Sequence, residues 1–252
     1  MADEVDVRVS LGFDPDAVLG SIDGYDEDTI SYLSSGTAAL NAAYSALRGI
    51  HDAKAAAEAD QTMNRFGALL KTDDYARARM SKVWPLWETA ETVLNKNVRA
   101  WEAEMSQEVT SKASERVSTE IRSHFKALSV GERGVAIHDA IIAGDETVVT
   151  AVLGAPAMLS GFDEELKAAM LREWHERTNP AMAKRLRAST QMLDAIQSRV
   201  RVLRSEVKEA VGALHDYEPS KVNGAPILVR TWTPDDVRAR KKAADAPFTV
   251  GL

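Results

Sequence analysis

Apolar residues recur at every seventh position near the C-terminal end of the chain. One row consists of Leu186, Leu193, Val200, Val207 and Leu214. A second row, three or four residues away, consists of Met182, Ser189, Ile196, Leu203 and Ala210. The rows correspond to the a and d positions of about four heptads of a coiled coil. We therefore predict a long helix from about residue 180 to residue 214, which Asn179 caps and Pro180 begins.

These rows predict a helix seam, which is a surface against which another helix packs. The seam residues are Leu186, Leu193, Ile196, Val200, Leu203, Val207 and Leu214. The packing helix can belong to the same chain or to a partner. Because other segments of the chain are also amphipathic, we expect a bundle within one chain rather than a zipper between two copies.

Apolar residues at helical spacing mark the other long elements. One stripe runs from Ile30 to His51, and a second runs from Trp87 to Leu128. A helix start is predicted at Thr72–Asp74, and Pro85 either kinks that helix or begins a new one. A further short helix is predicted after Asp163.

Two short apolar helices are predicted in the middle of the chain, at about 131–142 and 145–153. Gly144 fits the end of the first helix and Asp145 fits the cap of the second. The segment Gly131–Gly134 is interpreted as a turn or a helix start rather than as a phosphate-binding loop. Together, residues 131–161 predict a small helical hairpin.

The predicted fold is therefore all-α, with long amphipathic helices in an antiparallel bundle. The bundle domain covers residues 29–215, and the hairpin at 131–161 is inserted into it. Two extended arms flank the bundle, at residues 1–28 and 216–252.

The N-terminal arm is strongly acidic. Residues 1–30 contain nine acidic residues and one basic residue, Arg8. One interpretation is a solvated, partly mobile segment. The other is an acidic segment that docks on a basic face of a partner or a neighbouring subunit.

The C-terminal arm holds four of the eight prolines of the chain. Residues 227–232 have strand character, and a short basic helix is predicted from Pro234 at most. A segment of this size cannot support its own core, so we expect it to become ordered against another surface. The candidate partner-binding residues are Trp232, Phe248 and Val250.

Basic residues gather on the last long helix, between residues 184 and 208. Arg187, Arg201 and Lys208 share one heptad position. They are candidates for contact with nucleic-acid phosphates or with the acidic N-terminal arm of the same or another copy. The alternative is the solvated flank of a coiled coil.

The sequence carries no recognisable catalytic pattern, and we expect no enzymatic activity. It lacks cysteine, a GxSxG elbow, a GxxxxGK loop and a GxGxxG loop. Its five histidines are scattered and form no metal-ligand pair, so no metal or cofactor is expected. The net charge of −7 argues against a dedicated nucleic-acid binder, and no apolar run is long enough to span a membrane.

The stretch GERGVAIHDAIIAGDETVVTAVLGAPAMLSGF, followed by a capped long helix and an extended tail, resembles helical virion-associated structural proteins of tailed bacteriophages. The resemblance covers about 35 residues and supplies no functional residues. It implies a role in virion assembly or genome delivery, near the portal or tail or inside the capsid. The implied location is the virion, or the host cytoplasm during assembly.

Three functional hypotheses follow. The first is a non-enzymatic assembly protein that clamps neighbouring subunits through its arms, as a homo-oligomer or as symmetry-repeated copies. The second is a nucleic-acid-associated helical protein that uses the basic strip at 184–208. The third is a small regulatory binding module that acts through the hairpin at 131–161.

Overall fold

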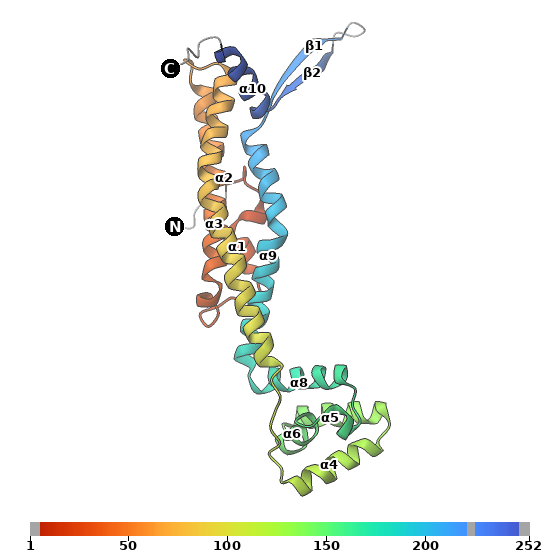
Figure 1. The fold of residues 1–252 in the computed structure, drawn as a ribbon. Coiled ribbons are helices and arrows are strands. Elements are labelled where there is room, and N and C mark those ends of the chain that lie inside the picture. The colour runs from red at the N-terminus through yellow and green to blue at the C-terminus, as the bar shows by residue number, and fades with distance from the viewer. Residues whose placement is uncertain (1–5, 221–224, 247–252) are drawn as a thin grey trace. The chain divides into compact units, whose positions relative to one another are not determined.

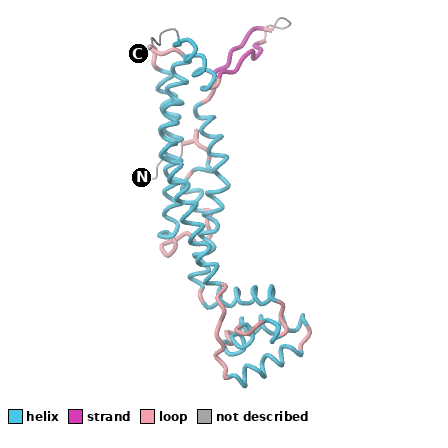
Figure 2. The backbone as a smooth tube through the Cα atoms, in the orientation of Figure 1, coloured by secondary structure: helices cyan, strands magenta, loops and turns pink. Residues whose placement is uncertain are grey.

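The computed structural model describes residues 6–220 and 225–246, and it confirms the all-α fold class (Figures 1 and 2). The helices are η1 (Leu11–Phe13), α1 (Pro15–Gly20), α2 (Ile30–Ala59), α3 (Arg65–Met105), α4 (Glu115–Ala127), α5 (Val130–Ala143), α6 (Glu146–Leu153), α7 (Ala157–Ser160), α8 (Glu164–Thr178), α9 (Pro180–Val211) and α10 (Pro234–Asp245). Strands β1 (Leu214–Pro219) and β2 (Pro226–Trp232) form a small antiparallel sheet.

The chain divides into two compact units. Unit 1 comprises Met1–Tyr25, Leu33–Leu94 and Gln191–Leu252, and unit 2 comprises Asp26–Tyr32 and Asn95–Thr190. The three long helices α2, α3 and α9 contribute residues to both units.

Unit 1 is built on α2, α3 and α9, which lie side by side (Figure 1). The fully buried indole of Trp87 on α3 reaches α9, where its Nε1 donates to the carbonyl of Ile196 at 3.1 Å. A Cβ added to Gly36 on α2 would lie 2.7 Å from the Cγ of Met192 on α9. The missing side chain therefore allows α2 and α9 to approach closely. Buried alanines follow on the same helix, at Ala39, Ala43 and Ala46.

The seam residues of α9 differ in burial within unit 1. Leu193, Ile196 and Leu203 are buried, whereas Val200 and Val207 are only partly buried. A straight helix has 3.6 residues per turn, so its face drifts by about 20° per heptad away from a strict seven-residue repeat. The buried face consequently takes in residues outside the two rows, namely Met192 and Val211.

Two seam residues lie outside this helical stretch of unit 1. Leu186 belongs to unit 2, where it is buried. Leu214 is not helical, contrary to prediction, because α9 ends at Val211 and Leu214 begins β1. Gly212 adopts a φ of 80°, a left-handed conformation that ends the helix and that only glycine adopts without strain.

The N-terminal segment within the described residues is folded, which differs from the predicted solvated arm. Five of its apolar residues are buried: Val9, Phe13, Val18, Leu19 and Ile22. The side chain of Asp14 caps α1 by accepting from the amide of Ala17 at 2.9 Å. The guanidinium of Arg199 on α9 donates to the carbonyl of Gly12 at 2.6 Å. The acidic composition predicted a solvated arm, but the five apolar residues of this segment belong to the core of unit 1.

Several acids of the N-terminal segment pair within the chain. In unit 1, Asp6 contacts Arg8 at 2.6 Å and Arg48 at 3.5 Å, and the hydrogen bond from Arg8 holds the pKa of Asp6 well below its ordinary value. In unit 2, Lys184 pairs with Asp26 and, at 3.3 Å, with Asp28. The acids therefore meet basic residues of their own copy.

Helix α3 differs from the predicted boundaries at both ends. It begins at Arg65, and Thr72 is an interior residue whose hydroxyl donates to the carbonyl of Ala68 at 2.9 Å. The helix continues through Pro85 and ends at Met105, so the predicted stripe from Trp87 to Leu128 is interrupted before α4. The interruption, residues 106–114, contains three serines together with Val109 and Thr110, all of which are weaker helix formers than alanine or leucine.

Helices α4 to α8 enclose a separate apolar core in unit 2. Its fully buried members include Ile137, Val149, Val152 and Leu153. The predicted caps of the hairpin are confirmed: Gly144 ends α5 at a φ of 69°, and the side chain of Asp145 accepts from the amide of Val148 at 3.0 Å. Asp163 caps α8 in the same way, by accepting from the amide of Leu166 at 2.6 Å.

A buried arginine holds this core together. Arg133 donates from Nε to the carbonyl of Phe125 and from Nη2 to the carbonyl of Leu128, both at 2.9 Å. It also donates to the carbonyl of Gly161, whose φ of 76° and missing Cβ leave room for the guanidinium. The last carbonyls of a helix lack the usual partner one turn further on, and a planar cation with several donors can satisfy more than one of them; that of Phe125 also accepts from the amide of Leu128 at 3.2 Å.

We expect Leu203→Ala to lower the free energy of unfolding by about 2–5 kcal/mol, because it leaves a cavity at a fully buried position. Val200→Ala on the same helix is the matched control and should cost about 1 kcal/mol or less, since Val200 is only partly buried. Urea unfolding followed by circular dichroism measures both. Equal losses of unfolding free energy in the two variants would show that both rows of the predicted seam are packed alike. That result would contradict the difference in burial between Leu203 and Val200.

We expect Arg133→Lys to destabilise the core of unit 2 by about 2–4 kcal/mol, because lysine keeps the charge but cannot reach three carbonyls at once. The control is Arg116→Lys, an exposed arginine of α4 that pairs with Glu120; its effect should stay within about 0.5 kcal/mol. Amide hydrogen exchange at Ile137 and Ile141 reports on this core. Unchanged exchange in Arg133→Lys would contradict the assigned role.

Candidate interaction site at the C-terminal hairpin

The β1–β2 hairpin follows directly from the end of α9 (Figure 1). Its register shifts between two neighbouring pairs: Asp216 opposes Arg230, whereas Tyr217 opposes Leu228. Val229 is therefore the extra residue of a β-bulge. A bulge of this kind moves the following residues to the other face, so Leu228 shares a face with Tyr217 rather than with Arg230.

Trp232, the last residue of β2, is the anchor of the hairpin. It is buried, and its Nε1 donates to Oδ2 of Asp216 at 2.6 Å. Its ring meets Phe66 of α3 edge to face, with 5.6 Å between ring centroids. The guanidinium of Arg230 lies 3.5 Å from the ring centroid of Trp232, and that of Arg240 lies 5.1 Å from it. Aromatic and cation–π contacts thus surround one side chain.

Helix α10 is fixed against α3 by charge pairs and by one buried valine. Thr233 and Asp236 form a capping box at its start, and Val237 is buried. Arg238 pairs with two carboxylates of α3, Asp73 at 2.6 Å and Asp74 at 2.5 Å. The described part of the C-terminal segment is therefore ordered within its own chain, which differs from the predicted extended arm.

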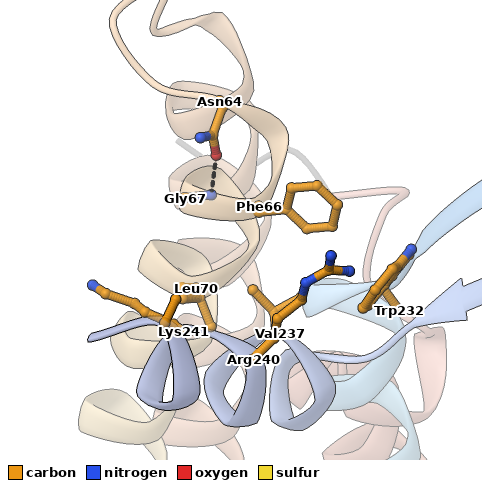
Figure 3. A pocket seen from close by; sticks show the side chains of 9 residues that line it. Asn64, Phe66, Gly67, Leu70, Trp232, Val237, Arg240 and Lys241 are labelled. Atoms are coloured by element: carbon orange, nitrogen blue, oxygen red, sulfur yellow. Dashed lines mark hydrogen bonds between the residues drawn. The ribbon is translucent and has the colours of Figure 1, made fainter. Parts of the chain in front are cut away.

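A hollow of about 530 Å³ lies beside Trp232 (Figure 3). Phe66, Leu70, Trp232 and Val237 supply its apolar wall, and Arg240 and Lys241 are its charged residues. The remaining lining residues are Asn64, Gly67 and Ala244. The side chain of Arg240 extends from α10 into the space between Phe66 and Trp232 (Figure 3). The lining suits a ligand that combines an apolar group with a negative charge close to it.

Beyond this anchor, the hairpin exposes apolar side chains. Ile227, Leu228 and Val229 are 52%, 51% and 55% exposed, and Tyr217 is 58% exposed. A two-stranded hairpin is marginally stable by itself, and three or more strands with an apolar face are needed for independent stability. Here, the contacts of Trp232 hold the base of the hairpin, while its outer part presents apolar residues and strand edges to solvent.

The predicted site residues fall into different environments. Trp232 is buried against its own chain, and Phe248 and Val250 lie outside the described residues. Arg187, Arg201 and Lys208 are exposed. Lys208 lines a second hollow, of about 590 Å³, which also includes Asp73, Glu209 and Asp235. This mixture of charges gives a phosphate no clear preference for that hollow.

Sequence reasoning missed the packing partner of Trp232, because Phe66 lies far away in the chain, on α3. It also missed the hairpin itself, although a signal existed. Asn223–Gly224 between two segments with apolar residues is a strong hairpin pattern. Recognising it would have predicted a hairpin between the two segments, but a two-residue turn there would pair Glu218 with Val229, whereas the structure pairs Glu218 with Ile227.

Within the described ranges, no group of three or more histidine and carboxylate residues is placed to hold a metal ion. In the same part of the chain, no helix has the length and apolar character that crossing a bilayer requires. No family model, curated protein or solved structure matches the chain.

We expect the indole N–H signal of Trp232 to titrate with a midpoint below the ordinary carboxyl value of about 3.9. Hydrogen bonds from Trp232 and from Arg65 stabilise the charged form of Asp216 and lower its pKa. Because the folded pKa lies below the unfolded one, this contribution to stability is present above about pH 4 and is lost as the pH falls through the folded pKa. Nuclear magnetic resonance measures the midpoint. The signal should not titrate in Asp216→Asn, and a midpoint at or above 3.9 would contradict the contact.

Proposed function

We propose that this chain is a non-enzymatic structural subunit of an assembly of repeated copies, and that it contacts its neighbours through the β1–β2 hairpin. The observation that carries the proposal is the exposed apolar run Ile227–Val229 on a hairpin with a firmly anchored base. Exposed apolar residues on a strand invite contact with another chain. The bulge at Val229 interrupts the regular ladder that a further strand would need, so the contact would use the apolar side chains rather than continuous strand pairing.

The base of the hairpin supports this role. An interaction element binds more tightly when its conformation is fixed before binding, because less conformational freedom is then lost on association. Trp232 is held by Phe66 and Asp216. Helix α10 is held because its Arg238 pairs with Asp73 of α3. The helices of unit 1 would then act as the frame that presents the hairpin.

The specific version of the proposal is a virion component of a tailed bacteriophage, near the portal or tail or inside the capsid. Its support is the resemblance of residues 131–162 to helical virion proteins, together with an architecture suited to repeated packing. In a virion, symmetry-related copies would each present the same hairpin to a neighbour.

We expect light scattering of the full chain to give a mass above the 27.5 kDa of one copy, rising with protein concentration. A triple variant, Ile227→Thr with Leu228→Thr and Val229→Thr, places strand-forming, β-branched side chains at all three positions but removes apolar surface, so it should shift the protein towards the monomer.

The matched control replaces three exposed apolar residues of unit 2, Val130→Thr with Val135→Thr and Met158→Thr, which are 68%, 60% and 75% exposed. This control should leave the mass unchanged. A monomer at every concentration would overturn the proposal, and so would loss of association in the control alone.

A further inference from the structure

We propose that the hollow beside Trp232 is a binding site for a small organic acid, in which a short linker joins a carboxylate to an aromatic or branched aliphatic group. The site lies wholly within unit 1. It is independent of the proposed assembly contact, because the exposed run Ile227–Val229 is not part of its lining. Its volume of about 530 Å³ falls within the ~300–1,000 Å³ that is usual for ligand pockets.

The apolar wall of the hollow is continuous with the core of unit 1. Trp232 and Val237 belong to a buried core cluster, and Phe66 and Leu70 pack against this cluster but are only partly buried. Both partly buried side chains line the hollow, so part of their surface faces it. An apolar group that enters the hollow would remove this surface from water, which favours binding.

Two cations, Arg240 and Lys241, give the hollow a positive charge. Within the described part of α10, the ion pairs involve Asp235 and Arg238, and none involves Arg240 or Lys241. The guanidinium of Arg240 lies 5.1 Å from the ring centroid of Trp232. Its planar fork of N–H donors matches the two oxygens of a carboxylate. Arg240 is therefore the residue that would hold the charged end of the ligand.

The cation lies directly against the apolar wall. Val237, Arg240 and Ala244 follow one another at intervals of three and four residues, so they share one face of α10. From this face, Arg240 reaches into the space between Phe66 and Trp232 (Figure 3). A ring that covers the aromatic wall would consequently have its carboxylate only a few bonds away. This proximity is the reason for the short linker.

Three other hollows of the described residues have a different lining. One of about 500 Å³ is bordered by Arg48 and Asp52, and each of these already has an ion-pair partner in the chain. The hollow of about 590 Å³ at Lys208 contains both cations and carboxylates. A hollow of about 540 Å³ shares Lys241 but also contains Asp74. The proposed site differs from these three because its lining contains cations and no carboxylate.

The acid 3-phenylpropanoate and its amide test the site, because they share one shape and differ in charge. The readout is the indole N–H signal of Trp232 in nuclear magnetic resonance, identified by its absence from Trp232→Phe. The acid should shift this signal with a dissociation constant on the order of 1 mM. The amide should bind about tenfold more weakly, because it lacks the charge-assisted hydrogen bond. Acetate, which has the charge but no ring, should leave the signal unchanged.

Three variants of α10 separate the charge from the apolar wall. Arg240→Met removes the charge but keeps an unbranched stem, so it should abolish the preference for the acid and leave binding of the amide within about twofold. The matched control is Lys242→Met, a neighbouring cation outside this lining, which should keep the tenfold preference. Ala244→Leu keeps a good helix former at an exposed position and fills the hollow, so it should weaken acid and amide alike by about fivefold or more.

Several outcomes would overturn the inference. These are equal affinity for acid and amide in the unchanged protein, a tenfold preference that persists in Arg240→Met or disappears in Lys242→Met, and unchanged binding in Ala244→Leu. The peptide acetyl-Phe-Glu-amide carries the same chemistry on a polypeptide. Binding of the free acid, with or without the peptide, supports the site, whereas binding of the peptide alone would overturn it in favour of a contact with a partner chain.

Discussion

The burial of Trp232 is the contact on which the C-terminal part of the structure depends. This side chain ends β2, packs on Phe66 of α3 and donates to Asp216 of β1, and its ring contacts the guanidinium groups of Arg230 and Arg240. One residue thus connects a helix of the frame, both strands and α10. Without it, a two-stranded hairpin would have too little buried surface to hold a fixed position. Its outer apolar residues would then present no defined surface.

Local signals in the sequence predicted much of the helical architecture. The caps at Gly144, Asp145 and Asp163 were readable because each depends on residues within one helical turn. Predictions failed where a single distant or small feature decides the outcome. Gly212 ends α9 before Leu214, and the apolar residues of the acidic N-terminal segment are too few to form a periodic stripe. The acidic composition of this segment predicted a solvated arm, whereas its few apolar residues are buried.

The candidate site was only partly predictable for the same reason. Trp232 was recognised as an anchor, but the sequence could not say that its partners are Phe66 and Arg240 of the same chain. The role of Arg133 was missed because its acceptors are backbone carbonyls, which leave no mark in the sequence. The exposure of Ile227–Val229 also depends on long-range packing, since strand character alone does not reveal which strands lack neighbours.

The charge pairs of the chain bear on how it could associate. The sequence offered its acidic N-terminal segment and its basic last helix as complementary surfaces for two copies. In the structure, Asp26 and Asp28 pair with Lys184, and Asp6 pairs with Arg48, so part of this complementarity is used within one copy. Association through the apolar hairpin would therefore respond weakly to salt, since screening acts on exposed charges. Binding of nucleic-acid phosphates would instead weaken steeply with salt, because it releases counterions. The two modes of action thus differ in a property that follows directly from which residues remain on the surface.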